Sequence, residues 1–368
     1  MIRKNYKNYI LCIGFLILII CMPISYIWLQ DYVDTKNYEN RELAEKPKLS
    51  WGNVEVLPAE IEYYFNDYLP YKNWLCESAN QINYNLFRES ASREVIIGDD
   101  DWLFYNTQTD GKPMDQYLGR DLYSEEKLKE IAENLTITEQ YLAERGIEFV
   151  ILILPNKERV YYDKLPSKYI EPAIEYGTLQ IVEYLRENTN IRVVYPYEEL
   201  MKAREEYPET SFYFHADTHW NRAGGYIGAV ALYKELGMDF VPFEDLTLEK
   251  NNASNLDLAY LINMQKSYEN DTNYTVTGYG QENLKYEYCD FYVESKAYNE
   301  TVDTGKLFMI HDSFAIYMGD YVANGFSDSF FVHNAHFNQT MIEEQQPDVV
   351  VLETVERYIG SLEEYRFE

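Results

Sequence analysis

The segment from His215 to Asn221 holds the densest group of chemically active side chains in this sequence. Asp217 and His219 stand two positions apart, and in an extended stretch such residues point to the same face. A carboxylate beside an imidazole fixes its tautomer and stabilises the imidazolium that forms when the ring takes up a proton. The alternative is an ordinary loop before a helix, with Asp217 or Asn221 acting only as the helix cap. His219 and Asp217 are therefore candidates for a general base and the acid that orients it.

A serine stands directly after a second apolar run, the strand predicted at 306–310. Open α/β sheets place their sites at the C-terminal ends of parallel strands, which makes Ser313 a candidate nucleophile. Backbone N–H groups at the start of a following helix could receive an oxyanion there. The alternative is that Asp312 or Ser313 is a simple helix cap. Together, Ser313, His219 and Asp217 supply the parts of an acyl-transfer triad.

Three further residues could lie at the same edge of the sheet. Asn156 and Lys157 follow a continuous apolar run at 149–154, which is typical of a buried parallel strand. Asn156 could donate a hydrogen bond to an oxyanion, or it could be a turn residue. His311 could line the pocket or be a buried histidine of the core.

Two other histidines, His333 and His336, are expected to be satisfied core residues. The sequence has no glycine-rich phosphate loop and no dinucleotide fingerprint. It also has no cysteine or histidine cluster with the spacing of a zinc site. We therefore expect no cofactor and no metal.

The elements that would position these residues alternate between strand and helix. Apolar runs indicate strands at 95–97, 102–105, 149–154, 191–195, 306–310, 330–332 and 349–352. Helices are expected at 125–145, 179–186, 222–236 and 339–346. This alternation predicts an α/β domain with a mostly parallel sheet. Residues 238–304 have no clear helical period, and we expect an irregular insertion there.

The N-terminal segment 8–30 carries no charged side chain. About 20 apolar residues suffice to span the hydrocarbon core of a membrane. Basic residues precede the segment and acidic residues follow it, so the positive-inside rule places the N-terminus in the cytoplasm. A cleaved signal peptide and a buried globular helix are the alternatives. The predicted organisation is a cytoplasmic tail at 1–7, an anchor at 8–30, a linker with short helices at 31–90, and an extracytoplasmic catalytic domain at 91–368.

The net charge and the amino-acid composition limit the classes of molecule that this protein can bind. The 368 residues include 62 acidic and 32 basic side chains, for a net charge of −30. Such a surface repels nucleic acid and anionic lipid, which excludes a nucleic-acid-binding role. The 37 tyrosines could be core and surface filler or an aromatic surface suited to sugars. Cys76 and Cys289 could form a single disulfide, but two isolated cysteines are no disulfide scaffold.

Several motifs resemble a known family. Gly98–Tyr105 resembles the Gly-x-Asp-Gly-Trp-Leu-Phe-Tyr opening motif of the alginate O-acetyltransferase AlgJ/AlgX family. Asp217–Trp220 resembles the Asp-x-His-Trp motif that this family shares with the related DHHW proteins, and His311–Phe314 resembles their Gly-Asp-Ser-Phe block. Leu154–Lys157 and Gln346–Val350 resemble further DHHW segments. The resemblance runs from about residue 90 to the end in the expected order, and DHHW is the nearest match.

This resemblance implies an SGNH-hydrolase-like three-layer sandwich whose motif order is permuted, with Asp-x-His before the serine. It implies that Ser313 is the nucleophile, His219 the general base and Asp217 its orienting acid. His311 replaces a glycine before Asp-Ser, which changes the backbone freedom near the oxyanion hole. Asp101 replaces a glycine before Trp102. The residues expected to bind substrate or an oxyanion are Asn156, Lys157, Asp312, Trp220 and His311.

Members of the family act outside the cytoplasmic membrane and move acetyl groups onto cell-surface or secreted polysaccharide. They often act beside a multi-pass membrane acyltransferase that supplies the acyl group. The resemblance thus predicts a serine-dependent O-acetyltransferase with an acetyl-serine intermediate. Two alternatives stay open. One is a glycan acetylesterase with the same triad, and the other is a non-catalytic module that binds or assembles glycan.

Overall fold

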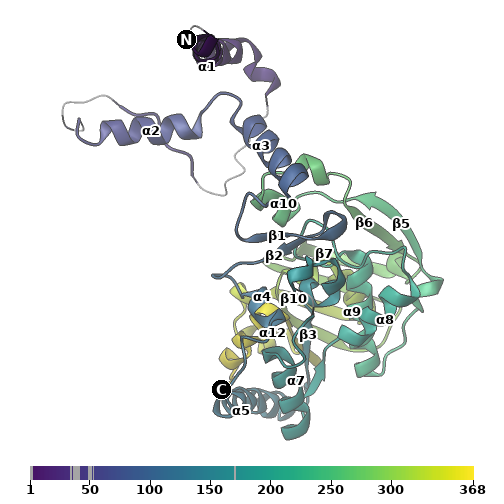
Figure 1. The fold of residues 1–368 in the computed structure, drawn as a ribbon. Helices are drawn as coiled ribbons and strands as arrows, with labels where there is room; N and C mark the ends of the chain where they lie inside the picture. The colour runs from purple at the N-terminus through teal and green to yellow at the C-terminus, as the bar shows by residue number, and fades with distance from the viewer. Residues whose placement is uncertain (1–2, 34, 36–41, 49–51, 53, 170) are drawn as a thin grey trace. The chain divides into compact units, whose positions relative to one another are not determined.

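The computed structural model describes residues 3–33, 35, 42–48, 52, 54–169 and 171–368 (Figure 1). The chain divides into two compact units. The first comprises residues 1–91 with 262–264, and the second comprises residues 92–261 with 265–368. Parts of the linker predicted at 31–90, namely 34, 36–41, 49–51 and 53, lie outside the described residues.

The first unit is helical. It contains α1 (Arg3–Leu29), η1 (Gln30–Tyr32), α2 (Leu57–Asp67) and α3 (Lys72–Phe87). The predicted anchor therefore forms a helix, and residues 8–32 are long and apolar enough to cross a membrane, with none of that stretch buried. At 1.5 Å per residue, the 27 residues of α1 extend about 40 Å, which exceeds the thickness of the hydrocarbon core. Its length and composition fit either an anchor or a signal sequence.

The second unit opens with a hairpin of β1 (Val95–Ile97) and β2 (Leu103–Tyr105). Both strands are where the apolar runs predicted them. In the turn, Asp100 and Asp101 have φ angles of 52° and 64°. This left-handed region favours glycine, and aspartate is among the few other residues that tolerate it. The replacement of glycine by Asp101 is therefore compatible with the turn.

The main sheet has seven strands in the order β4-β3-β11-β9-β10-β8-β7. Five neighbouring strands run parallel to one another: β3 (Glu148–Leu154), β4 (Arg192–Val194), β9 (Lys306–His311), β10 (Asp328–His333) and β11 (Val349–Val355). Two antiparallel strands complete the edge, β7 (Leu284–Asp290) and β8 (Glu294–Asn299). The predicted, mostly parallel sheet is confirmed.

Each face of the sheet has its own hydrophobic core, because side chains alternate along every strand. In β3, Val150, Leu152 and Leu154 belong to one core, and their alternating neighbours belong to the other. The first core includes α9 (Arg222–Leu236) and α11 (Gly319–Asn324). The second includes α5 (Glu125–Ala143), α7 (Gly177–Asn188) and α12 (Thr340–Gln345). Helices on both faces give the three layers of an α/β sandwich.

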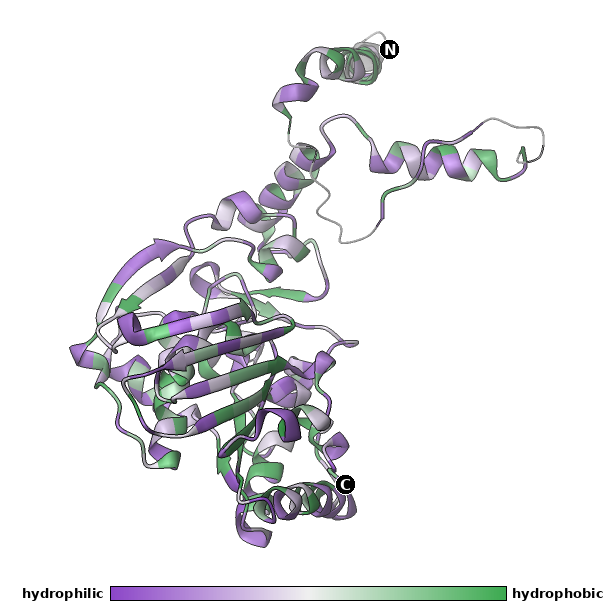
Figure 2. Ribbon diagram, turned by 180° about the vertical axis from the view of Figure 1, so that it is seen from behind, coloured by the Kyte–Doolittle hydropathy of each residue, from purple (hydrophilic) through white to green (hydrophobic). Residues whose placement is uncertain are grey.

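The expectation of an irregular insertion at 238–304 was wrong. This segment contains β5 (Thr247–Asn252), α10 (Asp257–Leu261), β6 (Thr272–Thr277) and the sheet strands β7 and β8. Its strands carry more hydrophilic residues than the central strands do (Figure 2). Edge and surface strands bury little side-chain area, so their sequences show no long apolar run.

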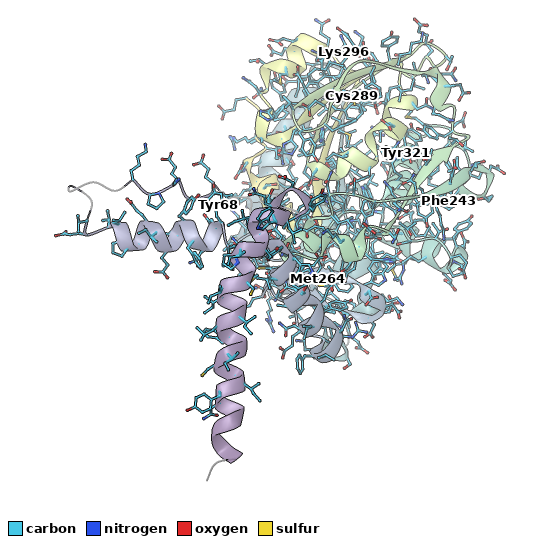
Figure 3. All side chains as sticks on the ribbon, turned by 90° about the horizontal axis from the view of Figure 1, so that it is seen from above. Tyr68, Phe243, Met264, Cys289, Lys296 and Tyr321 are labelled. Carbon is cyan, nitrogen blue, oxygen red and sulfur yellow. The ribbon has the colours of Figure 1, made fainter. Side chains whose placement is uncertain are left out.

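Cys289 on β7 lies close in the sheet to Lys296 on β8, and both are labelled in Figure 3. Cys76 and Cys289 are both free and exposed, so the disulfide considered from the sequence is not formed in this structure.

Candidate active site

Asp217, His219 and Ser313 form one continuous chain of hydrogen bonds. His219 Nδ1 lies 2.6 Å from Asp217 Oδ1, and His219 Nε2 lies 2.7 Å from Ser313 Oγ. With the ring proton on Nδ1, the imidazole donates to the carboxylate and accepts from the hydroxyl. A nucleophile, a base and an orienting acid in this order are what activation of a serine requires.

The base and its acid lie in a tight loop between the isolated bridge partners Tyr213 and Trp220. Asp217 Oδ1 accepts the backbone N–H of His219 at 2.9 Å as well as its ring nitrogen. The two residues thus meet through a turn and not through the extended segment expected from the sequence. Asn221 then caps α9, because its side-chain oxygen accepts from Ala223 N and Gly224 N; it is one of the two caps considered from the sequence.

The charges of the pair stabilise each other. Burial disfavours the charged form of Asp217, but the positive charge of His219 and its hydrogen bonds outweigh that effect and lower the pKa of the carboxyl. Burial likewise acts to lower the pKa of His219, and the charge of Asp217 outweighs it, so that pKa is raised. The imidazole is therefore a stronger base than a free histidine.

The nucleophile turn is fixed by Asp312, which is 3% exposed. Ser313 is the first residue of η8 (Ser313–Tyr317), and Asp312 alone separates it from the end of β9. Asp312 Oδ1 accepts Phe314 N at 2.9 Å and Oδ2 accepts Val355 N at 2.7 Å. Its own N–H donates to Glu353 Oε2 at 2.8 Å. Asp312 is thus a helix cap, which is the alternative considered from the sequence. Its two carboxylate oxygens accept hydrogen bonds from backbone N–H groups.

The same turn carries a backbone N–H that is a candidate oxyanion donor. Among the described residues, no group accepts the backbone N–H of Ser313. In serine acyl-transfer sites, the N–H of the nucleophile itself is a common donor to the oxyanion that forms on the attacked carbonyl.

His311 lies directly beneath this turn and is fully buried. Its Nδ1 lies 2.7 Å from Asp312 O, and its Nε2 has no hydrogen-bond partner among the described residues. Burial lowers its pKa to about 4, so the ring is neutral. His333 is partly buried and lies 5.9 Å from His311 between ring centroids, whereas His336 is exposed. The core role expected for His336 was therefore wrong.

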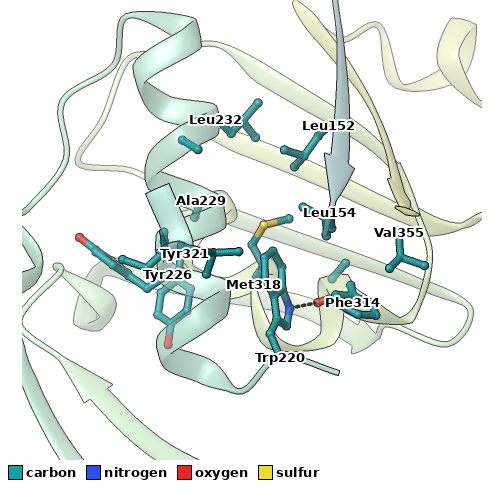
Figure 4. Packing of buried hydrophobic residues seen from close by; sticks show 14 of the residues in the cluster. Leu152, Leu154, Trp220, Tyr226, Ala229, Leu232, Phe314, Met318, Tyr321 and Val355 are labelled. Carbon is teal, nitrogen blue, oxygen red and sulfur yellow. Dashed lines mark hydrogen bonds between the residues drawn. The ribbon is translucent and has the colours of Figure 1, made fainter. Parts of the chain in front are cut away.

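Three residues expected to bind substrate or an oxyanion have structural partners instead. Trp220 is fully buried and donates its indole N–H to Phe314 O at 2.9 Å (Figure 4). The Asn156 amide donates to Gln116 Oε1 at 2.9 Å, and no hydrogen bond joins it to Ser313 or His219 in the described part of the chain. A side chain with no exposed surface cannot face a substrate, which rules out that role for Trp220 in this conformation.

Lys157 is the third of these residues. It is 1% exposed and its Nζ donates to the carbonyls of Phe214, His215 and Asp217 at 3.3, 3.2 and 2.6 Å. Burial lowers its pKa. The ammonium therefore holds the backbone of the loop that carries Asp217, and it has no free donor left for a substrate.

Asp257 was not predicted from the sequence as a site residue, and its Oδ2 lies 3.8 Å from His219 Nδ1. It lies in the segment without periodicity, where nothing in its neighbours distinguishes it from other acidic residues. The ligand atoms of Asp217, His219 and Asp257 lie within 4.8 Å of one another, as a metal centre would require. Asp217 Oδ1 is already bonded to His219, and both Asp257 oxygens accept from Thr218, so hydrogen bonding accounts for the cluster.

Comparison with known proteins places this geometry in a family. The model of the family "SGNH hydrolase-like domain, acetyltransferase AlgX" matches residues 95–278, half of the chain. No curated protein sequence matches the chain. Among solved structures, Bacillus cereus PatB1 is 17% identical with a TM-score of 0.54, covering 73% of this chain and 96% of its own. A DHHW family protein from Eubacterium siraeum is 12% identical with a TM-score of 0.54, covering 76% and 98%.

These structural similarities show a common fold at low sequence identity. The family match includes the segment with Asp217 and His219 and ends before Ser313. The chain belongs to the AlgX family of SGNH hydrolase-like acetyltransferase domains.

Proposed function

We propose that this protein is a membrane-anchored, extracytoplasmic O-acetyltransferase that modifies a cell-surface or secreted polysaccharide through an acetylated Ser313. The observation that carries the proposal is the continuous hydrogen-bond chain from Asp217 through His219 to Ser313, at 2.6 and 2.7 Å. Membership of an acetyltransferase family supports acetyl as the transferred group.

In the first half-reaction, Ser313 Oγ attacks the carbonyl carbon of an acetyl ester or thioester while His219 Nε2 takes the hydroxyl proton. The negative charge moves to the carbonyl oxygen, where the Ser313 N–H can bind it. Collapse breaks the bond to the leaving group, which takes the proton from His219. Acetyl-Ser313 and a neutral His219 remain.

In the second half-reaction, a sugar hydroxyl attacks acetyl-Ser313 while His219 takes its proton. Collapse releases the acetylated sugar, and the proton returns to Ser313 Oγ. Water in place of the sugar would yield acetate, which is the esterase alternative. Asp217 stays ionised throughout, because the imidazolium beside it lowers its pKa.

The location is supported by the stretch 8–32, which is apolar and unburied and which follows the basic residues Arg3, Lys4 and Lys7 of α1. An anchor of this kind would hold the second unit beside a multi-pass membrane acyltransferase, the partner that we propose as the source of acetyl groups. No acyl donor would then need to diffuse through the medium.

The test is the intact mass of the full chain, purified in detergent and exposed to 4-nitrophenyl acetate. We expect one added acetyl group, mapped to Ser313, and its loss in Ser313→Ala. Ser167→Ala is the matched control, since Ser167 also begins a short 3-10 helix but is exposed. An acetyl group on Ser313→Ala at the wild-type level would overturn the mechanism.

Product analysis with a polysaccharide acceptor separates the alternatives. Acetylated glycan identifies a transferase, and free acetate alone identifies an esterase. Glycan binding that survives Ser313→Ala, with no acetyl-enzyme under any condition, would identify a non-catalytic module. A sulfonyl reagent offers a second covalent probe, because PatB1 has been solved with a sulfonyl adduct.

A further inference from the structure

Asp257 is joined to the Asp217–His219 loop by three hydrogen bonds. As the first residue of α10, it donates its backbone N–H to Asp217 Oδ2 at 2.8 Å. Its own Oδ1 accepts Thr218 N at 2.8 Å, and its Oδ2 accepts Thr218 Oγ1 at 2.5 Å. Asp257 therefore binds the residue before His219 by two bonds and the orienting acid by one.

The same carboxylate faces the catalytic imidazole. Asp257 Oδ2 lies 3.8 Å from His219 Nδ1, beyond hydrogen-bond distance but close enough for a strong charge interaction. The other acidic partner, Asp217, holds that nitrogen at 2.6 Å. The imidazolium formed during proton transfer would thus have two carboxylates on its Nδ1 side.

Two cations and one tyrosine also lie near Asp217, Asp257 and His219. Lys157 donates to three backbone carbonyls, and Arg357 lies over the Phe314 ring, 5.3 Å from its centroid. Both cations favour ionised carboxyls in the site, and Arg357 disfavours a charged His219. The Tyr317 ring lies 6.0 Å from His219, and burial raises the pKa of its hydroxyl to well above neutrality.

We propose that Asp257 is a positioning residue of the acyl-transfer site, a second carboxylate that orders the Asp217–His219 turn and stabilises the imidazolium. This inference rests on the proposed function. The backbone N–H of Asp257 occupies Asp217 Oδ2, which keeps Asp217 Oδ1 turned toward the ring. The Asp257 carboxylate supplies a second negative charge beside the imidazole ring, where positive charge develops in the transition state.

The titration of Asp257 fits this role. Burial and the adjacent charge of Asp217 raise its pKa to about 6. Because 39% of its side chain is exposed, screening by water reduces the size of this shift but not its direction. Asp257 is therefore ionised in neutral solution, and its charge adds to that of Asp217 in raising the pKa of His219.

The experiment compares Asp257→Asn with the wild type in the full chain. The amide keeps an acceptor for Thr218 N and removes the charge. We expect the pKa of His219, followed by NMR of its ring protons, to fall by about one unit. We expect kcat for 4-nitrophenyl acetate to fall about tenfold, with the acid limb of the pH profile moved to lower pH.

Asp271→Asn is the matched control. Asp271 also binds this loop, accepting Ala216 N at 2.9 Å, but its carboxylate lies against His215 and not against His219. The Asp271→Asn variant should therefore have the same His219 pKa as the wild type. If Asp257→Asn does not fold, Asp257→Ser serves instead, because its hydroxyl can still accept Thr218 N.

The outcomes separate the two proposals. An unchanged His219 pKa in folded Asp257→Asn would overturn the role of Asp257, whatever the activity. If the wild type shows no activity, or if Ser313→Ala is as active as the wild type, the proposed function is overturned. The NMR titration of His219 would still decide the role of Asp257.

Discussion

Trp220 donates its indole N–H to the carbonyl oxygen of Phe314, and this bond joins the segment of His219 to the segment of Ser313. Trp220 directly follows His219, and Phe314 directly follows Ser313. The two residues are 94 apart in sequence and both are fully buried (Figure 4). A hydrogen bond one residue away from each reacting side chain thus fixes their separation.

Trp220→Phe should lower the free energy of unfolding by about 1 kcal/mol, because it removes the hydrogen bond between the indole and the Phe314 carbonyl. It should also lower kcat more than it raises KM, since the separation of His219 and Ser313 is no longer fixed. Denaturant unfolding and steady-state kinetics measure the two effects. Trp102→Phe is the control, because no hydrogen bond is described for the Trp102 indole. Equal behaviour of the two variants would contradict this account.

Gly225 lets α9 approach the turn that carries Ser313. A Cβ at this position would lie 2.2 Å from Tyr317 O and 2.7 Å from Tyr317 C, which are backbone atoms of the last residue of η8. Gly225→Ala should therefore displace the turn, lowering kcat about tenfold or more. Its stability should fall by about 1–3 kcal/mol.

Gly237→Ala is the comparison for this variant. Gly237 ends the same helix with a φ of 69°, and no atom lies within 4 Å of its Cβ position. That variant should lose about 1 kcal/mol of stability through strain alone and keep its activity. Full activity in Gly225→Ala would show that the turn tolerates displacement.

Glu353 makes stability depend on pH. It is 1% exposed, and burial together with the charge of Asp312 raises its pKa well above the ordinary 4.5. A raised folded pKa contributes stability that is complete below the unfolded pKa and is lost as pH rises through the folded pKa. Between the two values, the free energy of unfolding should fall by about 1.4 kcal/mol per pH unit.

Glu353→Gln should remove that slope while still accepting Asp312 N. Relative to the wild type, the variant should gain stability as pH rises from 5 to 8. Chemical unfolding at several pH values measures the difference. A slope in Glu353→Gln equal to that of the wild type would assign the pH dependence to other groups.

Sequence patterns were sufficient to predict that the side chains of Asp217, His219 and Ser313 lie together. Asp217 and His219 are neighbours along the chain, and Ser313 ends an apolar run of the kind that forms a central parallel strand. The strand at 149–154 and the helix at 222–236 were predicted nearly to the residue, because buried strands and capped helices have strong local signals.

The partners of the polar residues could not be predicted in this way. Lys157 and Trp220 are residue types that often bind substrates. Only their burial in the folded structure shows that they hold a loop in place instead. Asp257 meets His219 through tertiary structure, 38 positions away, in a segment of edge strands with no periodic pattern. A long-range contact made by one polar group produces no pattern in the local sequence from which it could be predicted.

The last strand of the chain, β11, lies in the middle of the sheet between β3 and β9. In sequence β11 follows the other six strands of this sheet, so β3 and β9 cannot be joined in the sheet before β11 has been synthesised. Val355, at its end, donates its N–H to Asp312 and completes the turn of Ser313. If the chain crosses a membrane unfolded behind its N-terminal helix, this strand order delays assembly of the Ser313 turn until residues 349–355 have crossed.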